Sequence, residues 1–169
     1  MISHQAMTTE VKICGLRSEP ALDAALAGGA DYIGFVFYQR SPRNIEPAAA
    51  RALADKARGR AKIVALLVDP DDALLADVIE TVAPDIVQLH GAETPERVAE
   101  IARRFGKPVM KAVAVATAAD VTAAFGECRA TRTMAALTAM IDTRPTHCSA
   151  SPMPSPQYGF DGPTSTGMT

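Results

Sequence analysis

The stretch Val-Lys-Ile-Cys-Gly at residues 11–15 has the pattern of a short apolar strand that ends in a thiol and is followed at once by a turn residue. Such a strand places Cys14 at its carboxyl end, where a parallel α/β barrel carries its chemistry. Four further strand-and-helix units follow this stretch at nearly regular spacing. The chain therefore begins as an α/β barrel enzyme would.

Short apolar runs predict the strands, and longer stretches that begin with proline or capping residues predict a helix after each strand. The expected strands cover residues 11–14, 32–37, 62–68, 85–90 and 109–113. Units of this kind in series predict parallel strands with right-handed crossovers, in a closing barrel or in an open sheet. The loop after the first strand reads Gly-Leu-Arg-Ser. It lacks the glycine-rich pattern of a nucleotide-binding open sheet, so the barrel is favoured.

The repeating pattern stops near residue 126, well before an eight-unit barrel of about 250 residues would be complete. Residues 127–169 contain no lysine and no valine, with only one leucine and one isoleucine. That composition predicts an atypical, poorly ordered tail instead of three buried strands. The expected organisation is an N-terminal extension at 1–7, five βα units of an incomplete (β/α)8 TIM barrel at 8–126, and the tail at 127–169.

Charge and cysteine content narrow the function classes. A formal net charge of −2 without blocks of like charge argues against nucleic acid or an acidic membrane surface as a partner, and favours a small molecule. The longest apolar runs are too short to span a membrane. The three cysteines, Cys14, Cys128 and Cys148, have neither metal-ligand spacing nor the pattern of a disulfide framework. A reducing, cytoplasmic location and a site without metal are expected.

Cys14 is the first candidate for chemistry, because a thiolate at a strand end can remove a proton from a carbon acid or attack an electrophile. A free cysteine is also often a packing residue, and this alternative stays open. Alternation along the strand puts Lys12 on the same face as Cys14. A nearby ammonium group would favour the thiolate.

Other polar residues fall at the same ends of later strands. Arg43 follows the second strand in Ser-Pro-Arg-Asn, where its forked donors could hold a carboxylate or phosphate, although it could equally be a solvated surface residue. Gln88 and His90 share a face with Ile86, so they line the barrel interior if Ile86 does; a satisfied structural histidine is the alternative. Lys111 on the fifth strand is either a paired core lysine or a substrate contact.

Five motifs extend these observations in chain order: Val-Lys-Ile-Cys-Gly-Leu at 11–16, Gly-Ala-Asp-Tyr-Ile-Gly-Phe-Val-Phe at 29–37, Ser-Pro-Arg at 41–43, Gln-Leu-His-Gly at 88–91 and Val-Met-Lys-Ala at 109–112. Together they resemble the phosphoribosylanthranilate isomerase family of tryptophan biosynthesis. The resemblance covers about residues 8–126, the first five of eight barrel units.

The resemblance implies an intramolecular aldose–ketose isomerase without a cofactor. Its reaction is the Amadori rearrangement of the phosphosugar N-(5-phosphoribosyl)anthranilate to 1-(2-carboxyphenylamino)-1-deoxyribulose 5-phosphate. By resemblance, Cys14 is the general base at sugar carbon 2 and Arg43 binds the anthranilate carboxylate. Gln88, His90 and Lys111 match substrate-binding positions near the active site. A monomer or a weak homodimer is expected.

The family also uses a general acid at the end of strand six and glycine-rich phosphate loops after strands seven and eight. Neither motif is recognisable in the sequence. Asp142 in Ala-Met-Ile-Asp-Thr-Arg-Pro is the nearest candidate for the acid, although it lies a few residues too far along, and Asp161 is a weaker one.

Two alternative hypotheses remain open. The first is a truncated or frameshifted non-catalytic fragment of the isomerase, with a change of coding frame near Gly126 and exposed sheet edges that favour aggregation. Rereading the encoding DNA in its other frames after codon 126 tests it: the absence of an apolar strand ending in aspartate and of a glycine-rich loop would contradict a frameshift. The second is another phosphosugar barrel, which the fold alone does not exclude, because one barrel architecture hosts many reactions. The thiol and the Ser-Pro-Arg loop argue against this alternative.

Overall fold

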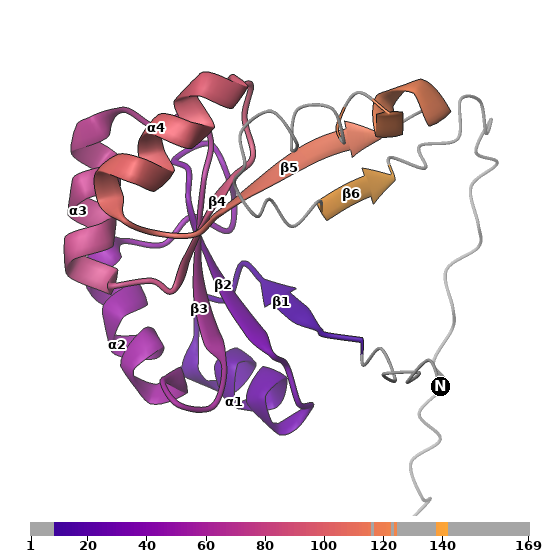
Figure 1. Cartoon of the computed structure of the whole chain (residues 1–169). Helices are drawn as coiled ribbons and strands as arrows, with labels where there is room; N and C mark the ends of the chain where they lie inside the picture. The colour runs from indigo at the N-terminus through magenta and orange to yellow at the C-terminus, as the bar shows by residue number, and fades with distance from the viewer. Residues whose placement is uncertain (1–8, 116, 123, 125–137, 142–169) are drawn as a thin grey trace, which may run out of the picture.

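The computed structural model describes residues 9–115, 117–122, 124 and 138–141 (Figure 1). Its strands are β1 (Lys12–Cys14), β2 (Tyr32–Phe37), β3 (Lys62–Leu67), β4 (Ile86–Leu89), β5 (Val109–Val115) and β6 (Thr138–Ile141). Its helices are α1 (Glu19–Ala27), α2 (Pro47–Ala57), α3 (Asp72–Val82) and α4 (Pro95–Phe105). Strands and helices alternate in the predicted order, and most boundaries agree with the sequence pattern within two residues.

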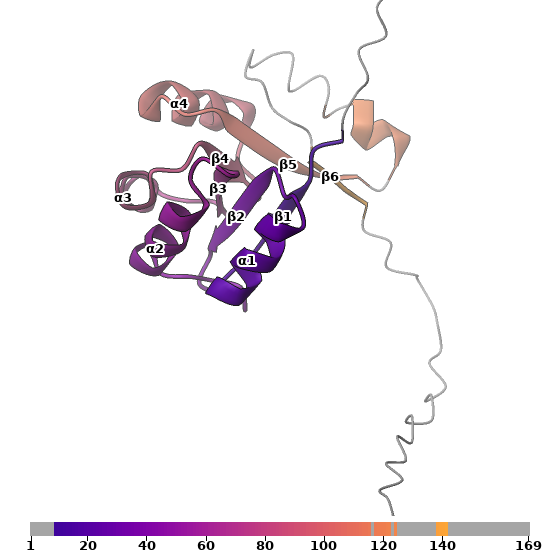
Figure 2. The ribbon, with the colours of Figure 1, turned by 90° about the horizontal axis from the view of Figure 1, so that it is seen from below.

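The order of the strands distinguishes the barrel from an open sheet. One six-stranded sheet has the order β1-β2-β3-β4-β5-β6, and every neighbouring pair is parallel. An open doubly wound sheet would reverse this order where its two halves meet. Helices α1 to α4 lie along one side of the curved sheet, as the two views in Figures 1 and 2 agree. The predicted incomplete barrel of five βα units is confirmed.

A sixth strand lies within the segment whose composition predicted none. β6 pairs with β5 in parallel, from Ala112 opposite Thr138 to Val115 opposite Ile141. A four-residue strand next to an existing edge needs only its backbone hydrogen bonds, so it forms without the valine-rich sequence of a strand covered on both faces. The barrel pattern therefore extends past residue 126.

The segment after β5 begins with a capping box. The backbone N–H of Thr117 donates to the Asp120 carboxylate at 2.7 Å, and the backbone N–H of Asp120 lies 3.4 Å from the Thr117 hydroxyl. Two donors that a helix start leaves unpaired are thus satisfied reciprocally. Residues 118–122 and 124 are helical.

The hydrophobic core lies between the sheet and the helices. Alternate residues of β2 point into it: Ile33 and Phe35 are fully buried, and Phe37 is 4% exposed. On α3 the buried stripe consists of Leu75, Val78 and Val82. Leu74, the residue before Leu75, lies outside this stripe and is 38% exposed. It lies about 100° around the helix from Leu75, in the first turn beside the preceding loop.

The opposite face of the sheet is the one that a complete barrel would enclose. Alternation assigns it Cys14, Gly34, Val64 and Gln88, and the registers Cys14 to Gly34 and Gly34 to Val64 place the first three in one row. Within the part of the chain that the structure describes, no helix has the length and apolar character to cross a membrane.

Candidate active site

Cys14 and Lys12 meet above a residue that has no side chain. Cys14 ends β1 opposite Gly34 of β2 and is half-buried as a free thiol. A Cβ atom at Gly34 would lie 2.7 Å from the Sγ of Cys14 and 3.1 Å from the Nζ of Lys12. Both functional groups therefore occupy the space over Gly34, which confirms the expectation that they share one face of the strand.

The turn after β1 receives the side chain of Arg43. Gly15 has a φ of +84°, and a Cβ there would lie 2.5 Å from the Cδ of Arg43. The loop that carries Arg43 is held in place, because Arg17 donates to the Pro42 carbonyl at 2.7 Å and the Arg43 N–H donates to the Ser41 hydroxyl at 3.1 Å. The Ser-Pro-Arg loop thus packs directly on Gly15, the turn residue that follows the Cys14 thiol.

Gln88 and His90 belong to the end of β4. Gln88 is 2% exposed, and its Oε1 accepts no hydrogen bond from the described part of the chain. A buried amide oxygen without a donor is costly, so this atom is available to a hydroxyl or N–H group that enters the site. His90 follows the strand and donates its backbone N–H to Leu67 at 2.9 Å. Alternation puts its imidazole on the same face as Gln88.

The imidazole of His90 lies in the electrostatic field of the other candidate residues. Burial lowers its pKa below the ordinary 6.5, and the positive charge of Lys111 lowers it further. The carboxylate of Glu93 acts in the opposite direction. Smaller lowering contributions come from Lys12 and Arg43. His90 is therefore neutral at neutral pH and can both accept and donate a hydrogen bond.

Lys111 is placed differently from the other four candidates. It pairs in register with Leu89, which is fully buried in the core beneath the helices. Its Nζ lies 2.6 Å from the Glu93 carboxylate and 2.5 Å from the Gly91 carbonyl. The side chains of the pair are 13% and 3% exposed. Of the two sequence-based alternatives for Lys111, the structure shows the paired lysine.

Two acidic residues of this arrangement, Glu93 and Asp69, were missed by the sequence reasoning. Glu93 accepts from the backbone N–H of Asp69 at 2.9 Å, and Asp69 in turn accepts from the N–H of Ala92 at 2.7 Å. The Asp69 carboxylate fills the space that a Cβ at Gly91 would need. A signal existed, because a buried lysine needs a partner and Glu93 is the one acidic residue in the loop after β4.

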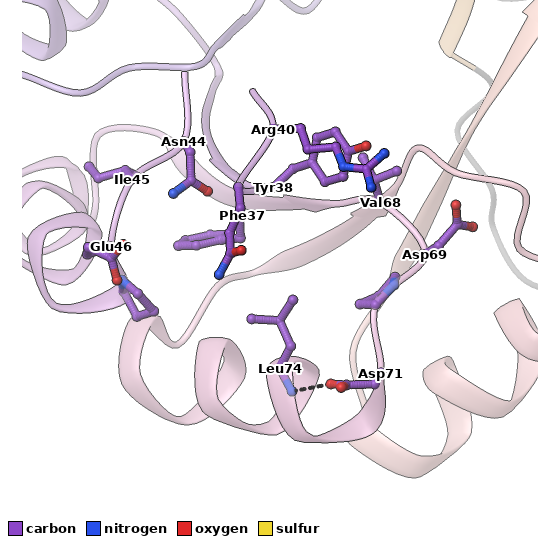
Figure 3. Close-up of a pocket in the computed structure, with 13 residues that line it drawn as sticks. Phe37, Tyr38, Arg40, Asn44, Ile45, Glu46, Val68, Asp69, Asp71 and Leu74 are labelled. Carbon is purple, nitrogen blue, oxygen red and sulfur yellow. Dashed lines mark hydrogen bonds between the residues drawn. The ribbon is translucent and has the colours of Figure 1, made fainter. Parts of the chain in front are cut away.

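A pocket of about 380 Å³ lies beside this site, between the loops that follow β2 and β3 (Figure 3). Its lining includes Tyr38, Arg40 and Asp69, with Leu74 exposed to it, and none of the five predicted site residues. Asp71 caps α3 by accepting from the N–H of Leu74 at 2.8 Å. Among the described residues no group of three or more His, Cys, Asp or Glu side chains could hold a metal ion.

The Glu93–Lys111 pair predicts an acid-dependent loss of stability. Burial by itself raises the pKa of Glu93, but hydrogen bonds from Lys111 and from the Asp69 backbone more than offset it, so the pKa lies below the ordinary 4.5. The stabilisation is therefore present above pH 4.5 and is lost as pH falls through the lower folded-state value. Glu93→Gln is expected to cost about 2–3 kcal/mol at neutral pH.

Urea unfolding followed by circular dichroism at several pH values measures this effect, with exposed Glu96→Gln as the matched control. The cost of Glu93→Gln should shrink as pH falls below 4.5. A cost that stays constant with pH would contradict the assignment.

A family model described as N-(5'-phosphoribosyl)anthranilate (PRA) isomerase matches residues 11–145. The chain belongs to this family. The match confirms the resemblance seen in the motifs, and it continues beyond residue 126 to take in β6 and Asp142. Asp142 itself, like Asp161, lies outside the described residues.

Individual members of the PRA isomerase family support the assignment. The N-(5'-phosphoribosyl)anthranilate isomerase of Rhodopseudomonas palustris strain BisA53 is 56% identical over 117 residues, which are 69% of this chain and 54% of that relative. The chain spans about half the length of the curated relatives it matches.

Solved structures of the PRA isomerase family share the fold. One is in complex with reduced 1-(o-carboxyphenylamino)-1-deoxyribulose 5-phosphate; it is 34% identical, has a TM-score of 0.67, and is matched over 72% of this chain and 62% of its own. Another describes monomers generated from the dimeric enzyme of Thermotoga maritima, with 34% identity, a TM-score of 0.66 and the same coverage. A phosphosugar ligand and a dimeric state thus occur among the relatives.

Proposed function

We propose that this chain catalyses the Amadori rearrangement of N-(5-phosphoribosyl)anthranilate to 1-(2-carboxyphenylamino)-1-deoxyribulose 5-phosphate. The observation that carries the proposal is the packing of Arg43 on Gly15, the residue that directly follows the Cys14 thiol, which itself lies over Gly34. A thiol that removes a proton from carbon and a guanidinium that holds a carboxylate are the two groups that this substrate needs close together.

The remaining residues have complementary roles. Arg43 binds the anthranilate carboxylate and so orients the sugar toward Cys14, which takes the proton from carbon 2. The buried Oε1 of Gln88 accepts a hydrogen bond from a sugar hydroxyl, and neutral His90 contributes a second polar contact. Lys111 acts on the substrate through the loop that it holds. No cofactor takes part, because each step moves protons and one ring C–O bond.

Asp142 completes the reaction in this proposal as the general acid that protonates the furanose ring oxygen. It follows Ile141, the last residue of β6, directly in the sequence, and β6 is parallel to β5. Chemistry in parallel barrels is found just past the carboxyl ends of strands, and Asp142 is the next residue in the sequence after one.

A non-catalytic fragment of the same enzyme is the second candidate, and a specific observation favours it. β1 is an edge strand of the sheet that the structure describes, and Val11 just before it and Ile13 within it are 45% and 38% exposed. Exposed apolar residues on an unpaired parallel edge favour aggregation. A frameshift after codon 126 stays a prediction that the encoding DNA tests.

Turnover by the purified full chain decides between the two candidates. Freshly generated phosphoribosylanthranilate is fluorescent, and its consumption is followed as loss of that fluorescence. Turnover that Asp142→Asn lowers by about 10²-fold or more, with the Asp161→Asn chain unaffected, supports the complete mechanism. A soluble chain without turnover that binds a hydrophobic dye and unfolds without cooperativity is the fragment.

We also propose the setting in which the chain works. A free thiol as catalytic base fits the reducing cytoplasm, and the near-neutral charge fits a small phosphosugar better than nucleic acid or a membrane surface. A monomer or weak homodimer is proposed for the chain; sedimentation equilibrium over a range of concentrations measures its state.

A further inference from the structure

The peptide segment that follows His90 is held by side chains from three different elements. The N–H of Gly91 donates to the Glu93 carboxylate at 3.0 Å, and the carbonyl of Gly91 accepts from the Lys111 ammonium at 2.5 Å. The next N–H, that of Ala92, donates to Asp69 at 2.7 Å. Since the N–H of His90 itself is bonded to Leu67 of β3, the backbone is fixed on both sides of the imidazole.

The side chains that hold this peptide segment are buried and closely packed. The Glu93 carboxylate is 3% exposed and accepts from Lys111, Gly91 and Asp69, so its oxygens are well supplied with donors. Gly91 has no space for a Cβ because the Asp69 carboxylate is there. Buried polar groups that are fully satisfied hold one conformation, whereas partly satisfied ones do not.

We infer that Glu93 and Lys111 are positioning residues, which hold the imidazole of His90 in the active site and balance the charge around it. The inference rests on the proposed function and extends it to two residues that touch no substrate. His90 is the first residue of the short loop between β4 and α4, and without these contacts the peptide after it would be less firmly held. The pair also places one positive and one negative charge near the imidazole, with opposite effects on its protonation.

Titration of His90 by nuclear magnetic resonance distinguishes positioning from simple loop stability. The signal of His90 is identified by its absence in a His90→Gln chain, since His4 and His147 are the other two histidines. The charged groups whose electrostatic field acts on the imidazole are Lys111 on β5, Glu93 in the loop after β4, Lys12 on β1 and Arg43 in the loop after β2. Lys111→Met should raise the pKa of His90, because a nearby cation is lost, and Glu93→Gln should lower it.

The matched controls make the same chemical substitutions at a glutamate and a lysine outside the Glu93–Lys111 pair. Glu96→Gln and Lys107→Met remove one charge of each kind from neighbouring positions and should leave the His90 titration unchanged. Lys111→Arg keeps the positive charge, so the pKa of His90 should stay below its ordinary value, as in the unmodified chain. This variant also serves as the test if Lys111→Met fails to fold. Shifts of the pKa of His90 upward in both Glu93→Gln and Lys111→Met, or no shift in either, would overturn the inference.

Steady-state kinetics supply the second readout. In a chain with turnover, both variants are expected to lower kcat/KM by about 10- to 100-fold, because a small misplacement of a substrate contact is costly. Unchanged kcat/KM in both would overturn the inference while the proposed function stands. A chain without turnover, in which the two titrations still shift in opposite directions, would overturn the proposed function and support the positioning of His90.

Discussion

Replacing Cys14 by alanine is expected to lower kcat/KM for phosphoribosylanthranilate by about 10²- to 10⁴-fold, the usual contribution of a general base. The thiol is half-buried, lies over Gly34 beside the Lys12 ammonium, and has Arg43 packed on the following turn. Alanine removes the proton acceptor and leaves the strand and its register unchanged. The loss should therefore fall on kcat, with a much smaller effect on KM.

The measurement is the initial rate of fluorescence loss at several substrate concentrations, with Cys128→Ala as the matched control. Circular dichroism and the urea midpoint of each variant show that the fold is retained. Full turnover by a correctly folded Cys14→Ala chain would mean that the thiol is a packing residue. A loss of the same size in Cys128→Ala would mean that the effect is not specific to the site.

Replacing Phe35 by alanine is expected to lower the free energy of unfolding by about 3–5 kcal/mol. Phe35 is fully buried in the middle of β2, which lies between β1 and β3. Its ring is among the largest fully buried side chains of the described core, so its removal leaves a cavity that neighbouring strands cannot fill.

Urea unfolding followed by circular dichroism checks this value against Phe105→Ala, whose ring is only partly buried at the end of α4. The loss at Phe105 should be clearly smaller. Equal losses at both positions would contradict a core centred on β2. Broad, non-cooperative unfolding of the unmodified chain would show that the incomplete barrel lacks a single cooperative unit.

The sequence predicted those strands and helix starts that depend on the residues within the element itself. The limits of β2 agree with the predicted residues, because an apolar run preceded by Gly29 leaves little choice. The Thr117–Asp120 capping box formed because both partners lie within one helical turn. β6 was missed, since the pairing that stabilises it belongs to β5 and not to its own composition.

The site could be predicted in its main positions and less well in its contacts. Cys14 and Arg43 were expected at the same end of the sheet, because one ends the first strand and the other follows the second. The space for each side chain depends on a glycine, Gly15 for Arg43 and Gly34 for Cys14, which spacing alone does not show. The partner of Lys111 was not predicted, because Glu93 is on another element and a strand pattern does not show which loop covers a buried charge.

The absence of a side chain at residue 34 limits how this candidate active site can vary. Even a methyl group there would compete for volume with the Cys14 sulfur and the Lys12 ammonium, and with the Cys14 backbone at 3.2 Å. The backbone cannot move aside without breaking the parallel ladder between β1 and β2. A substitution at this position would thus act first by displacing the thiol, so a chain could keep every reactive group and still lose its geometry.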